Sequence, residues 1–528
     1  MMISPRCLAS LLFVLFVSPP PVSCAEDELD ARIKEVLARP HYKHSRWGLL
    51  VVDADSGKPI FEHNPDQLFF PASVTKLFTC AAALIEFGAE HRFRTPVYRR
   101  GEVVEGTLKG DLILVGKGDP TLGGRTDRNG HLVFKDSDHT YVTPTSTLTE
   151  LPDTDPLAGL RDLARQVRQS GIRHVEGEVL IDNRLFVPSP ATGSGPKLFS
   201  PIMINDNLLD VIVKPADAFG EPATARMRPD NDFSHIDVQV QTGDRNSKSR
   251  ITVTRVGPDR YMVRGRIQLG SKPLVRICPV ENSELFARGL FIETLRREGI
   301  RVNASALHPP PAISLPETDA YAGLTRVALH ESPPLSELLS VILKVSHNLY
   351  ASALPLLIAA KHGKRTLADG MALEGKILGE LGIAVKDIAL ESGAGGGDCD
   401  RLTPRATVQL LRALSERPDF PVFRAALPVL GVDGTLVSAI PKDSPARGKV
   451  QAKTGTYADD DLLNNRQFLR SKSLAGVMTT KGGRRLVFAM FVNDVPLPRG
   501  VGSSREGKVL GELCEILYAH TTGAEGGR

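Results

Sequence analysis

The sequence lacks a strong excess of charge and the common motifs for binding nucleotides or zinc. Its formal net charge is only +4, from 65 basic and 61 acidic residues, which is too small an excess to indicate a nucleic-acid-binding surface. It contains no P-loop, no dinucleotide glycine fingerprint and no zinc-type cysteine pairing. We therefore expect no nucleic-acid partner, no cofactor and no metal ion.

Cysteine is scarce and scattered. Four cysteines lie beyond the N-terminal segment, at Cys80, Cys278, Cys399 and Cys514. They do not resemble the dense framework of a small disulfide-stapled domain, so buried free thiols are the favoured interpretation. One bridge stays compatible with an exported protein, and the sequence does not rank the three possible pairings.

Long apolar runs are missing after the N-terminus. Residues 7–17 are almost wholly apolar, follow a short basic stretch and precede three prolines and small residues ending at Cys24. This layout is typical of a cleavable secretory signal and is too short for a membrane span. We interpret residues 1–24 as a signal peptide, with lipidation of Cys24 as the alternative. The mature protein is expected to be secreted across the inner membrane, to be periplasmic or cell-wall associated, and to have no transmembrane segment.

The chain does have a serine–lysine pair with catalytic spacing. Ser73 and Lys76 are three positions apart, and Pro71 suits the first turn of a helix. Residues three apart share a helix face, so Lys76 can stand one turn above Ser73. A serine hydroxyl is a poor nucleophile near neutral pH and needs a base within hydrogen-bond reach. The pair therefore predicts a nucleophile with its general base.

Two further motifs follow, Ser346-His347-Asn348 and Lys453-Thr454-Gly455. Alone, the first would be interpreted as a helix cap, because Ser and Asn cap helices often, and Lys453 as a solvated strand lysine. Their occurrence together, in this order after the serine–lysine pair, indicates a catalytic set.

Ser-x-x-Lys, Ser-x-Asn and Lys-Thr-Gly, in that order, resemble the three motifs of the penicillin-binding proteins and serine β-lactamases. The long insertion between the first two motifs is similar to that of the class C low-molecular-mass penicillin-binding proteins, the D-alanyl-D-alanine carboxypeptidase/endopeptidases. Lesser signatures agree, namely Gly118–Leu122, Gly434–Leu436 and Leu474–Gly476.

The resemblance implies an α+β fold, in which a penicillin-binding/β-lactamase-like transpeptidase domain (an antiparallel sheet flanked by helices) carries a large β-rich insertion of one or two smaller domains. After the signal peptide at 1–24, we expect the first part of the catalytic domain at 25–93, with Ser-x-x-Lys. The β-rich inserted domain or domains then span 94–311. The second part of the catalytic domain, with Ser-x-Asn and Lys-Thr-Gly, spans 312–528.

The same resemblance implies a role for each motif residue. Ser73 would be the acyl-accepting nucleophile and Lys76 its general base. Ser346 and Lys453 would relay a proton to the leaving amine, and Asn348 would hold the substrate's peptide group and position the base. The backbone amides of the nucleophile and of Thr456 would form the oxyanion hole.

Strand alternation adds an expectation for the third motif. It places Thr454 and Thr456 on one side, suited to hydrogen-bond a C-terminal carboxylate, while Gly455 lets substrate backbone approach closely. Alternation would send Lys453 to the other side, unless the strand is an edge that twists strongly.

One loop departs from the resemblance. Asp398 stands in the glycine-rich segment 392–398, where family members often use an arginine near the substrate's side chain. An acidic group there would disfavour a free side-chain carboxylate, or it would simply make a turn. Residues 458–472 lengthen the chain after the third motif, as a loop near the cleft or as a tolerated insertion.

The expected function is that of a serine D-alanyl-D-alanine carboxypeptidase acting on peptidoglycan stem peptides through an acyl-serine intermediate and acylated by penicillin and other β-lactam antibiotics. The balance between carboxypeptidase and D,D-endopeptidase activity stays open. A β-lactamase or esterase on the same fold is the enzyme alternative, although class C β-lactamases carry Tyr at the place of Ser346. A catalytically silent peptidoglycan-binding protein is the other alternative.

Overall fold

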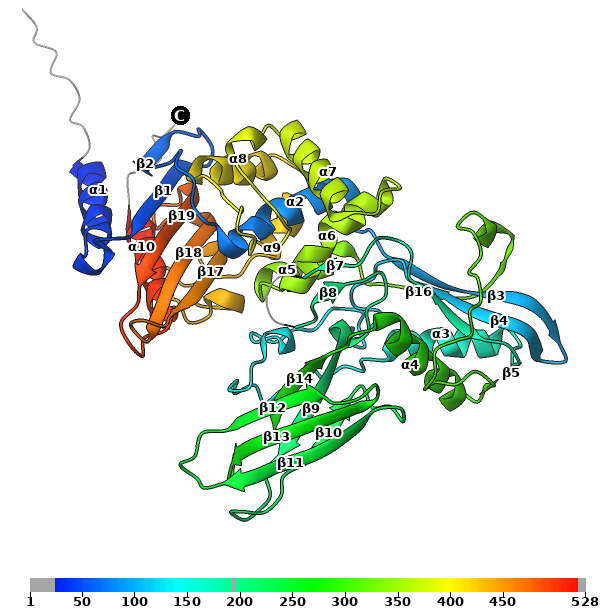
Figure 1. The fold of residues 1–528 in the computed structure, drawn as a ribbon. Helices are drawn as coiled ribbons and strands as arrows, with labels where there is room; N and C mark the ends of the chain where they lie inside the picture. Colours follow the sequence, from blue (N-terminus) through cyan, green and yellow to red (C-terminus); the bar gives the residue numbers. More distant parts are fainter. Residues whose placement is uncertain (1–23, 192–194, 521–528) are drawn as a thin grey trace, which may run out of the picture.

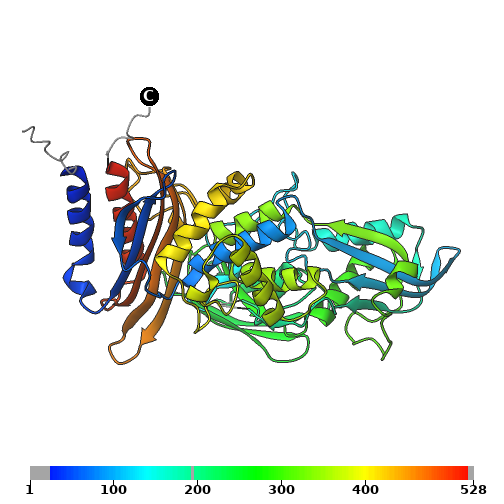
Figure 2. The same ribbon diagram turned by 90° about the horizontal axis from the view of Figure 1, so that it is seen from above.

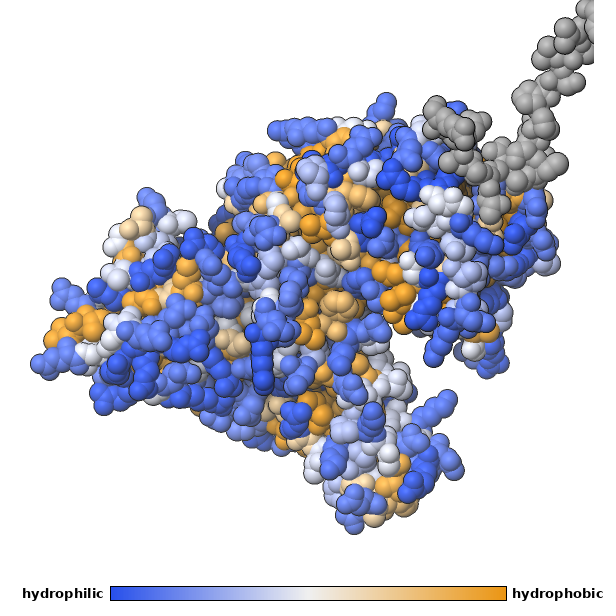
Figure 3. Space-filling model, turned by 180° about the vertical axis from the view of Figure 1, so that it is seen from behind, coloured by the Kyte–Doolittle hydropathy of each residue, from blue (hydrophilic) through white to orange (hydrophobic). Residues whose placement is uncertain are grey.

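The computed structural model describes residues 24–191 and 195–520, so the predicted signal peptide lies outside the described residues apart from Cys24. Of the described residues, none forms a helix that combines the length and apolarity needed to cross a bilayer. Cys80, Cys278 and Cys514 are buried free thiols, and Cys399 is an exposed one. Hydrophilic residues cover most of the face seen in Figure 3, and apolar ones gather in separate patches.

A five-stranded antiparallel sheet joins the two ends of the chain, in the order β17-β18-β19-β1-β2. The strands are β1 (Arg46–Asp53), β2 (Pro59–His63), β17 (Val450–Asp461), β18 (Arg466–Thr479) and β19 (Arg485–Pro496). In β1 every residue after Arg46 is buried, since helices cover both faces of the sheet. The strand that carries the Lys-Thr-Gly motif, β17, lies at the sheet edge.

Helices pack on both faces of this sheet (Figures 1 and 2). One face is covered by α1 (Cys24–Leu37) and α10 (Ser504–Ala519), over a core that includes Leu49, Phe488 and Leu513. The other face meets the helical layer that holds the first two motifs. Its helices are α2 (Lys76–Phe87), α5 (Leu335–Lys344), α6 (Asn348–Lys361), α7 (Leu367–Glu380), α8 (Pro404–Ser415) and α9 (Phe420–Ala425).

Between α2 and α5 the chain forms a separate β-rich region that extends away from the central sheet (Figure 1). One of its sheets packs with α3 (Ala158–Gln169) and α4 (Ser283–Arg297) over a shared core. That sheet consists of β3 (Arg94–Val104), β4 (Thr107–Val115), β5 (His174–Val175), β6 (Val179–Asp182), β15 (Arg301–Val302) and β16 (Thr325–Glu331). Two three-stranded sheets pack over a second core. They consist of β9 (Leu208–Lys214), β10 (Thr224–Arg228), β11 (His235–Gly243), β12 (Arg250–Arg255), β13 (Arg260–Gln268) and β14 (Leu274–Pro279), and a short pair, β7 (Ser189–Pro190) and β8 (Leu198–Phe199), completes the region.

The sheet that contains β3 continues past residue 311, the predicted end of the inserted region. Strand β16 follows that boundary, yet it pairs antiparallel with β3, with Leu329 opposite Pro96. The proline triplet 309–311 therefore does not end this sheet, because β3 takes its second partner from further along the chain. The division into 25–93, 94–311 and 312–528 stays a prediction, and the sheet itself ends at Glu331.

Candidate active site

Ser73 lies in a short 3-10 turn, Ala72–Thr75, that leads into α2. The sequence predicted it within the first turn of the helix, but Lys76 is the first residue of α2. Tertiary contacts fix this turn. Ser471 Oγ donates to the carbonyl of Phe70 at 2.7 Å, and Ser473 Oγ donates to the carbonyl of Pro71 at 2.7 Å. The turn is therefore fastened to β18, which no local sequence pattern reveals.

Gly455 is needed where the serine turn meets the edge strand. A Cβ at this position would lie 2.5 Å from the carbonyl oxygen of Pro71, and 3.2 Å from the backbone nitrogen of Ser73. Any side chain would push the nucleophile away from β17. The structure thus gives Gly455 a packing role, and its predicted role in admitting substrate backbone stays a prediction.

Lys76 is completely buried and points at the nucleophile. Its Nζ lies 2.9 Å from Ser73 Oγ, 2.6 Å from Asn348 Oδ1 and 2.7 Å from the carbonyl oxygen of Ala394. Burial lowers the pKa of Lys76 to about 7. An amine with that pKa is partly neutral near neutral pH, so it can accept the proton of the serine hydroxyl.

Lys453 and Ser346 form a second lysine–serine pair at the site. Lys453 Nζ lies 2.9 Å from Ser346 Oγ and 2.8 Å from the carbonyl oxygen of Thr454. Burial, and then the nearby charge of Lys76, hold the pKa of Lys453 well below its usual value. The strand β17 does lie at the sheet edge, and the contact with Ser346 places the Lys453 side chain next to the second motif.

Residues from all three motifs border one cavity of about 300 Å³. The polar residues lining it are Ser73, Tyr141, Ser346, Asn348, Thr435, Thr454, Thr456 and Lys472. The cavity thus opens onto the serine, the second motif and the edge of the sheet together, which is the arrangement that a peptide substrate lying along β17 requires.

Asp398 does not line this cavity. Its side chain is 91% exposed, and one of its oxygens lies 3.4 Å from Nη1 of Arg470. The guanidinium of Arg470 also lies over the rings of Phe70 and Tyr457. Arg470 belongs to the lengthened segment 458–472, which extends β17 and β18 into a long hairpin. The loop that carries an acid where an arginine was expected is therefore next to an arginine from elsewhere in the chain.

Sequence reasoning missed Lys472. It lies on β18 directly opposite Thr456, is only 9% exposed, and its Nζ donates to Thr456 Oγ1 at 2.7 Å. Burial lowers the pKa of Lys472 to about 8. Only the pairing register of β17 with β18 places this lysine at the cavity, and no pattern within either strand gives that register.

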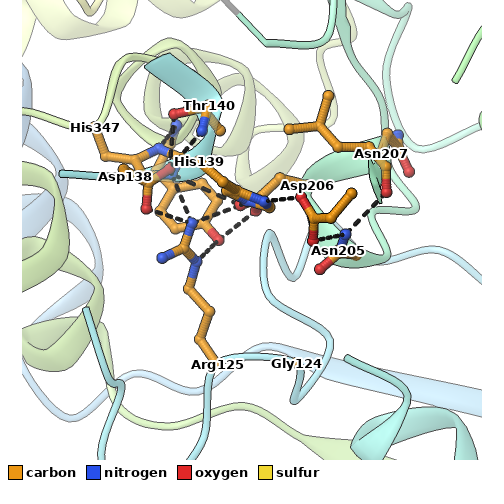
Figure 4. Close-up of polar contacts among 12 residues, drawn as sticks. Gly124, Arg125, Asp138, His139, Thr140, Asn205, Asp206, Asn207 and His347 are labelled. Carbon is orange, nitrogen blue, oxygen red and sulfur yellow. Dashed lines mark hydrogen bonds and ion pairs between the residues drawn. The ribbon is translucent and has the colours of Figure 1, made fainter. Parts of the chain in front are cut away.

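A buried network behind the second motif was also missed (Figure 4). Arg125 Nη2 lies 2.7 Å from Asp138, 2.6 Å from Asp206 and 3.2 Å from Nε2 of His347. The hydroxyl of Tyr141 donates to the carbonyl of Ser346 at 2.5 Å. Ser346 itself has a positive φ of 64°, an uncommon conformation for serine. Loops of the β-rich region therefore hold the turn that presents the second motif.

Asp138, Asp206 and His347 offer three ligand atoms within 4.8 Å of one another, a separation compatible with a metal ion. The guanidinium of Arg125 already lies between them and neutralises the carboxylates. A second cation in the same place would be repelled. The chemistry of this set therefore fits an ion-pair network better than a metal site.

Comparison with known proteins gives a consistent result. The family model of the D-Ala-D-Ala carboxypeptidase 3 (S13) family matches residues 29–507. The D-alanyl-D-alanine carboxypeptidase of Actinomadura sp. (strain R39) is 28% identical over 466 residues, covering 83% of this chain and 78% of the relative. The D-alanyl-D-alanine carboxypeptidase DacB of Haemophilus influenzae is 24% identical over 478 residues, covering 85% of each chain.

Solved structures confirm the expected fold. The crystal structure of penicillin binding protein 4 (dacB) from Haemophilus influenzae matches with a TM-score of 0.68 and 21% identity, covering 92% of this chain and 98% of that one. A second structure of the same protein, complexed with a β-lactam, matches with a TM-score of 0.68 and 22% identity, over 92% of this chain and 98% of that chain. The α+β architecture, with an antiparallel sheet flanked by helices and a β-rich insertion, is thus confirmed.

Proposed function

The chain belongs to the D-Ala-D-Ala carboxypeptidase 3 (S13) family and is a serine-type D-alanyl-D-alanine carboxypeptidase, and from this premise we propose how its own residues carry the reaction. Ser73 attacks the carbonyl of the penultimate D-alanine of a peptidoglycan stem peptide. The terminal D-alanine leaves, and water then hydrolyses the acyl-serine.

The first proton transfer runs from Ser73 Oγ to Lys76 Nζ, 2.9 Å away. This step is supported by the burial of Lys76, which brings its pKa to about 7 and leaves part of the amine free to act as a base. Asn348 Oδ1, at 2.6 Å, and the carbonyl of Ala394, at 2.7 Å, hold the amine in place. The base therefore needs little reorganisation when the substrate arrives.

The second transfer delivers a proton to the nitrogen of the departing D-alanine. Ser346 Oγ borders the cavity and lies 2.9 Å from Lys453 Nζ, so Ser346 gives its hydroxyl proton to the leaving amine and recovers one from Lys453. Lys453 in turn recovers the proton that Lys76 took from Ser73, so the relay returns both lysines to their starting state. Peptide cleavage needs this step because an amide anion is too basic to leave unprotonated. The amides of Ser73 and Thr456 would stabilise the oxyanion, and such a donor contributes about 3 kcal/mol in comparable sites.

One observation supports this proposal most strongly. Lys76 and Lys453, two buried lysines with lowered pKa values, are each hydrogen-bonded to a serine that borders the same cavity. A structural role alone gives no reason to bury two amines so close together, since each disfavours the charge of the other. We propose further that β-lactam antibiotics acylate Ser73, that cross-linked peptides are a second substrate, and that the protein acts outside the inner membrane, where peptidoglycan lies.

Release of D-alanine from a soluble pentapeptide ending in D-Ala-D-Ala, followed by a digest of purified cross-linked muropeptides, tests the substrate assignment. We expect release of D-alanine from the pentapeptide, and loss of that release in Ser73→Ala. Cleaved cross-links would establish the endopeptidase activity. Rapid turnover of penicillin, without release of D-alanine from the pentapeptide, would instead indicate the β-lactamase alternative. Neither activity, with intact binding of muropeptides, would indicate the silent binding protein.

A further inference from the structure

A third buried lysine borders the catalytic cavity. Lys472 Nζ donates to Thr456 Oγ1 at 2.7 Å, and the residue lines the cavity together with Ser73 and Thr454. Among residues 24–191 and 195–520, no carboxylate oxygen lies within the 4.0 Å of its Nζ that defines an ion pair. A largely buried ammonium without a counter-ion is costly, and such groups usually pair with an anion.

The acid whose charge acts on Lys472 already has other partners. Glu506, at the start of α10, influences Lys472 only through its field. Its carboxylate already accepts from the hydroxyl of Tyr42 and lies 2.5 Å from the guanidinium of Arg505. Lys472 therefore lacks a counter-ion among the described residues, and it lines the cavity into which a negatively charged group of a substrate could enter.

The position of Lys472 identifies the anion chemically. Gly455 packs against the backbone of Ser73, Thr456 is the next residue along β17, and Lys472 is directly opposite Thr456 in the strand register. A substrate whose scissile carbonyl lies at Ser73 carries its terminal carboxylate only three bonds beyond that carbonyl. The polar groups available to that carboxylate in the cavity are the hydroxyls of Thr454 and Thr456 and the ammonium of Lys472, which donates to Thr456.

Resting on the proposed function, we propose that Lys472 binds the C-terminal carboxylate of the substrate and is the residue that makes the enzyme select a free carboxylate at this place. The threonine hydroxyls supply neutral hydrogen bonds, and Lys472 supplies the charge. A charge-assisted hydrogen bond is about twice as strong as a neutral one, so the lysine dominates discrimination against uncharged ends.

A matched pair of pentapeptides tests this role, one ending in a free D-alanine carboxylate and the other in the corresponding carboxamide. In Lys472→Met we expect kcat/KM on the carboxylate peptide to fall about 10- to 100-fold, the loss of one hydrogen bond to a charged group. The rate on the carboxamide should stay within about threefold, because neither form of the site offers it an ion pair. Lys472→Arg should retain most of the preference.

Lys481→Met is the matched control, because it removes an exposed lysine that follows β18 and lies outside the cavity. It should leave both rates unchanged. Thermal unfolding of each variant reports on folding, and Lys472→Gln replaces Lys472→Met if the latter unfolds.

An equal fall of kcat/KM on both peptides in Lys472→Met, or an unchanged preference for the carboxylate peptide, would overturn the proposed role of Lys472. The proposed function would still hold if the native protein releases D-alanine. Native protein that cleaves neither peptide would overturn the proposed function and this role with it.

Discussion

Lys453 Nζ lies 2.9 Å from Ser346 Oγ, although the two residues are 107 positions apart. The contact joins the edge strand of the central sheet to the turn between α5 and α6. Ser346 lines the same cavity as Ser73, whose turn is held by β18. The two serines and two lysines therefore occupy one site built from three distant segments.

The pH dependence of acylation should report the basicity of Lys76. Its pKa is lowered to about 7, so the amine is protonated and inactive below that pH and free above it. The acylation rate should therefore rise with pH through an apparent pKa near 7 and fall about tenfold per unit well below it. The second-order rate of acylation by penicillin, measured from about pH 5 to about pH 9, checks this.

Lys76→Arg gives the matched control, because a guanidinium stays protonated throughout this range. Acylation should drop roughly 10²- to 10⁴-fold and lose its pH-dependent rise. A variant that keeps the native profile would show that another group titrates.

Lys453→Ala and Ser346→Ala should each slow acylation, by less than the loss of Lys76. Since the two side chains act as one relay, the double variant should be little slower than the worse single variant. Pre-steady-state acylation rates of the two single variants and the double variant give the coupling. Losses that multiply would indicate that the residues act independently.

Asp206→Asn should destabilise the protein through the network behind the second motif. Burial alone would raise the pKa of Asp206, but the charge of Arg125 holds it well below its usual value. Removing this carboxylate leaves the guanidinium under-compensated in a buried place, at a cost of about 3–5 kcal/mol. Denaturant unfolding of this variant should show that loss of free energy.

Asp55→Asn is the control, because it breaks an exposed ion pair with Arg485. Such pairs contribute about 0–1 kcal/mol, so this variant should unfold almost as the native protein does. A similarly small change in Asp206→Asn would show that the network does not support the fold.

The loop at Asp398 should govern the choice of the stem peptide's third residue. An acidic group there disfavours a free carboxylate and favours an amidated or cationic side chain. Arg470, 3.4 Å away, weakens this effect by partial neutralisation. On pentapeptides that differ only at the third residue, we expect the native protein to prefer the amidated or cationic form and Asp398→Arg to reverse the order.

Arg470→Ala should strengthen the native preference, since it removes the positive charge next to Asp398. A native preference for the free carboxylate, or an Asp398→Arg variant with unchanged rates, would rule the idea out.

The sequence predicts the catalytic set well because three short motifs, in a fixed order, need no knowledge of the fold. The structure brings Ser73, Lys76, Asn348, Ser346 and Lys453 together, while their individual roles stay predictions. The helix α5 can also be predicted from the sequence, because apolar residues recur at helical spacing within Leu335–Lys344 and are buried in the structure.

What the sequence does not predict depends on contacts between distant segments. The 3-10 turn at Ser73 is imposed by Ser471 and Ser473, and β16 finds its partner far back in the chain at β3. Lys472 reaches the cavity through a strand register, and Arg125 meets its partners only through loops of the β-rich region. No local pattern carries such information.

The most direct test of the central claim is mass spectrometry of the penicillin-treated protein. We expect one penicilloyl group on the peptide that contains Ser73, and no adduct in Ser73→Ala. An adduct on a different residue, or one that persists in Ser73→Ala, would contradict the assignment of Ser73 as the nucleophile.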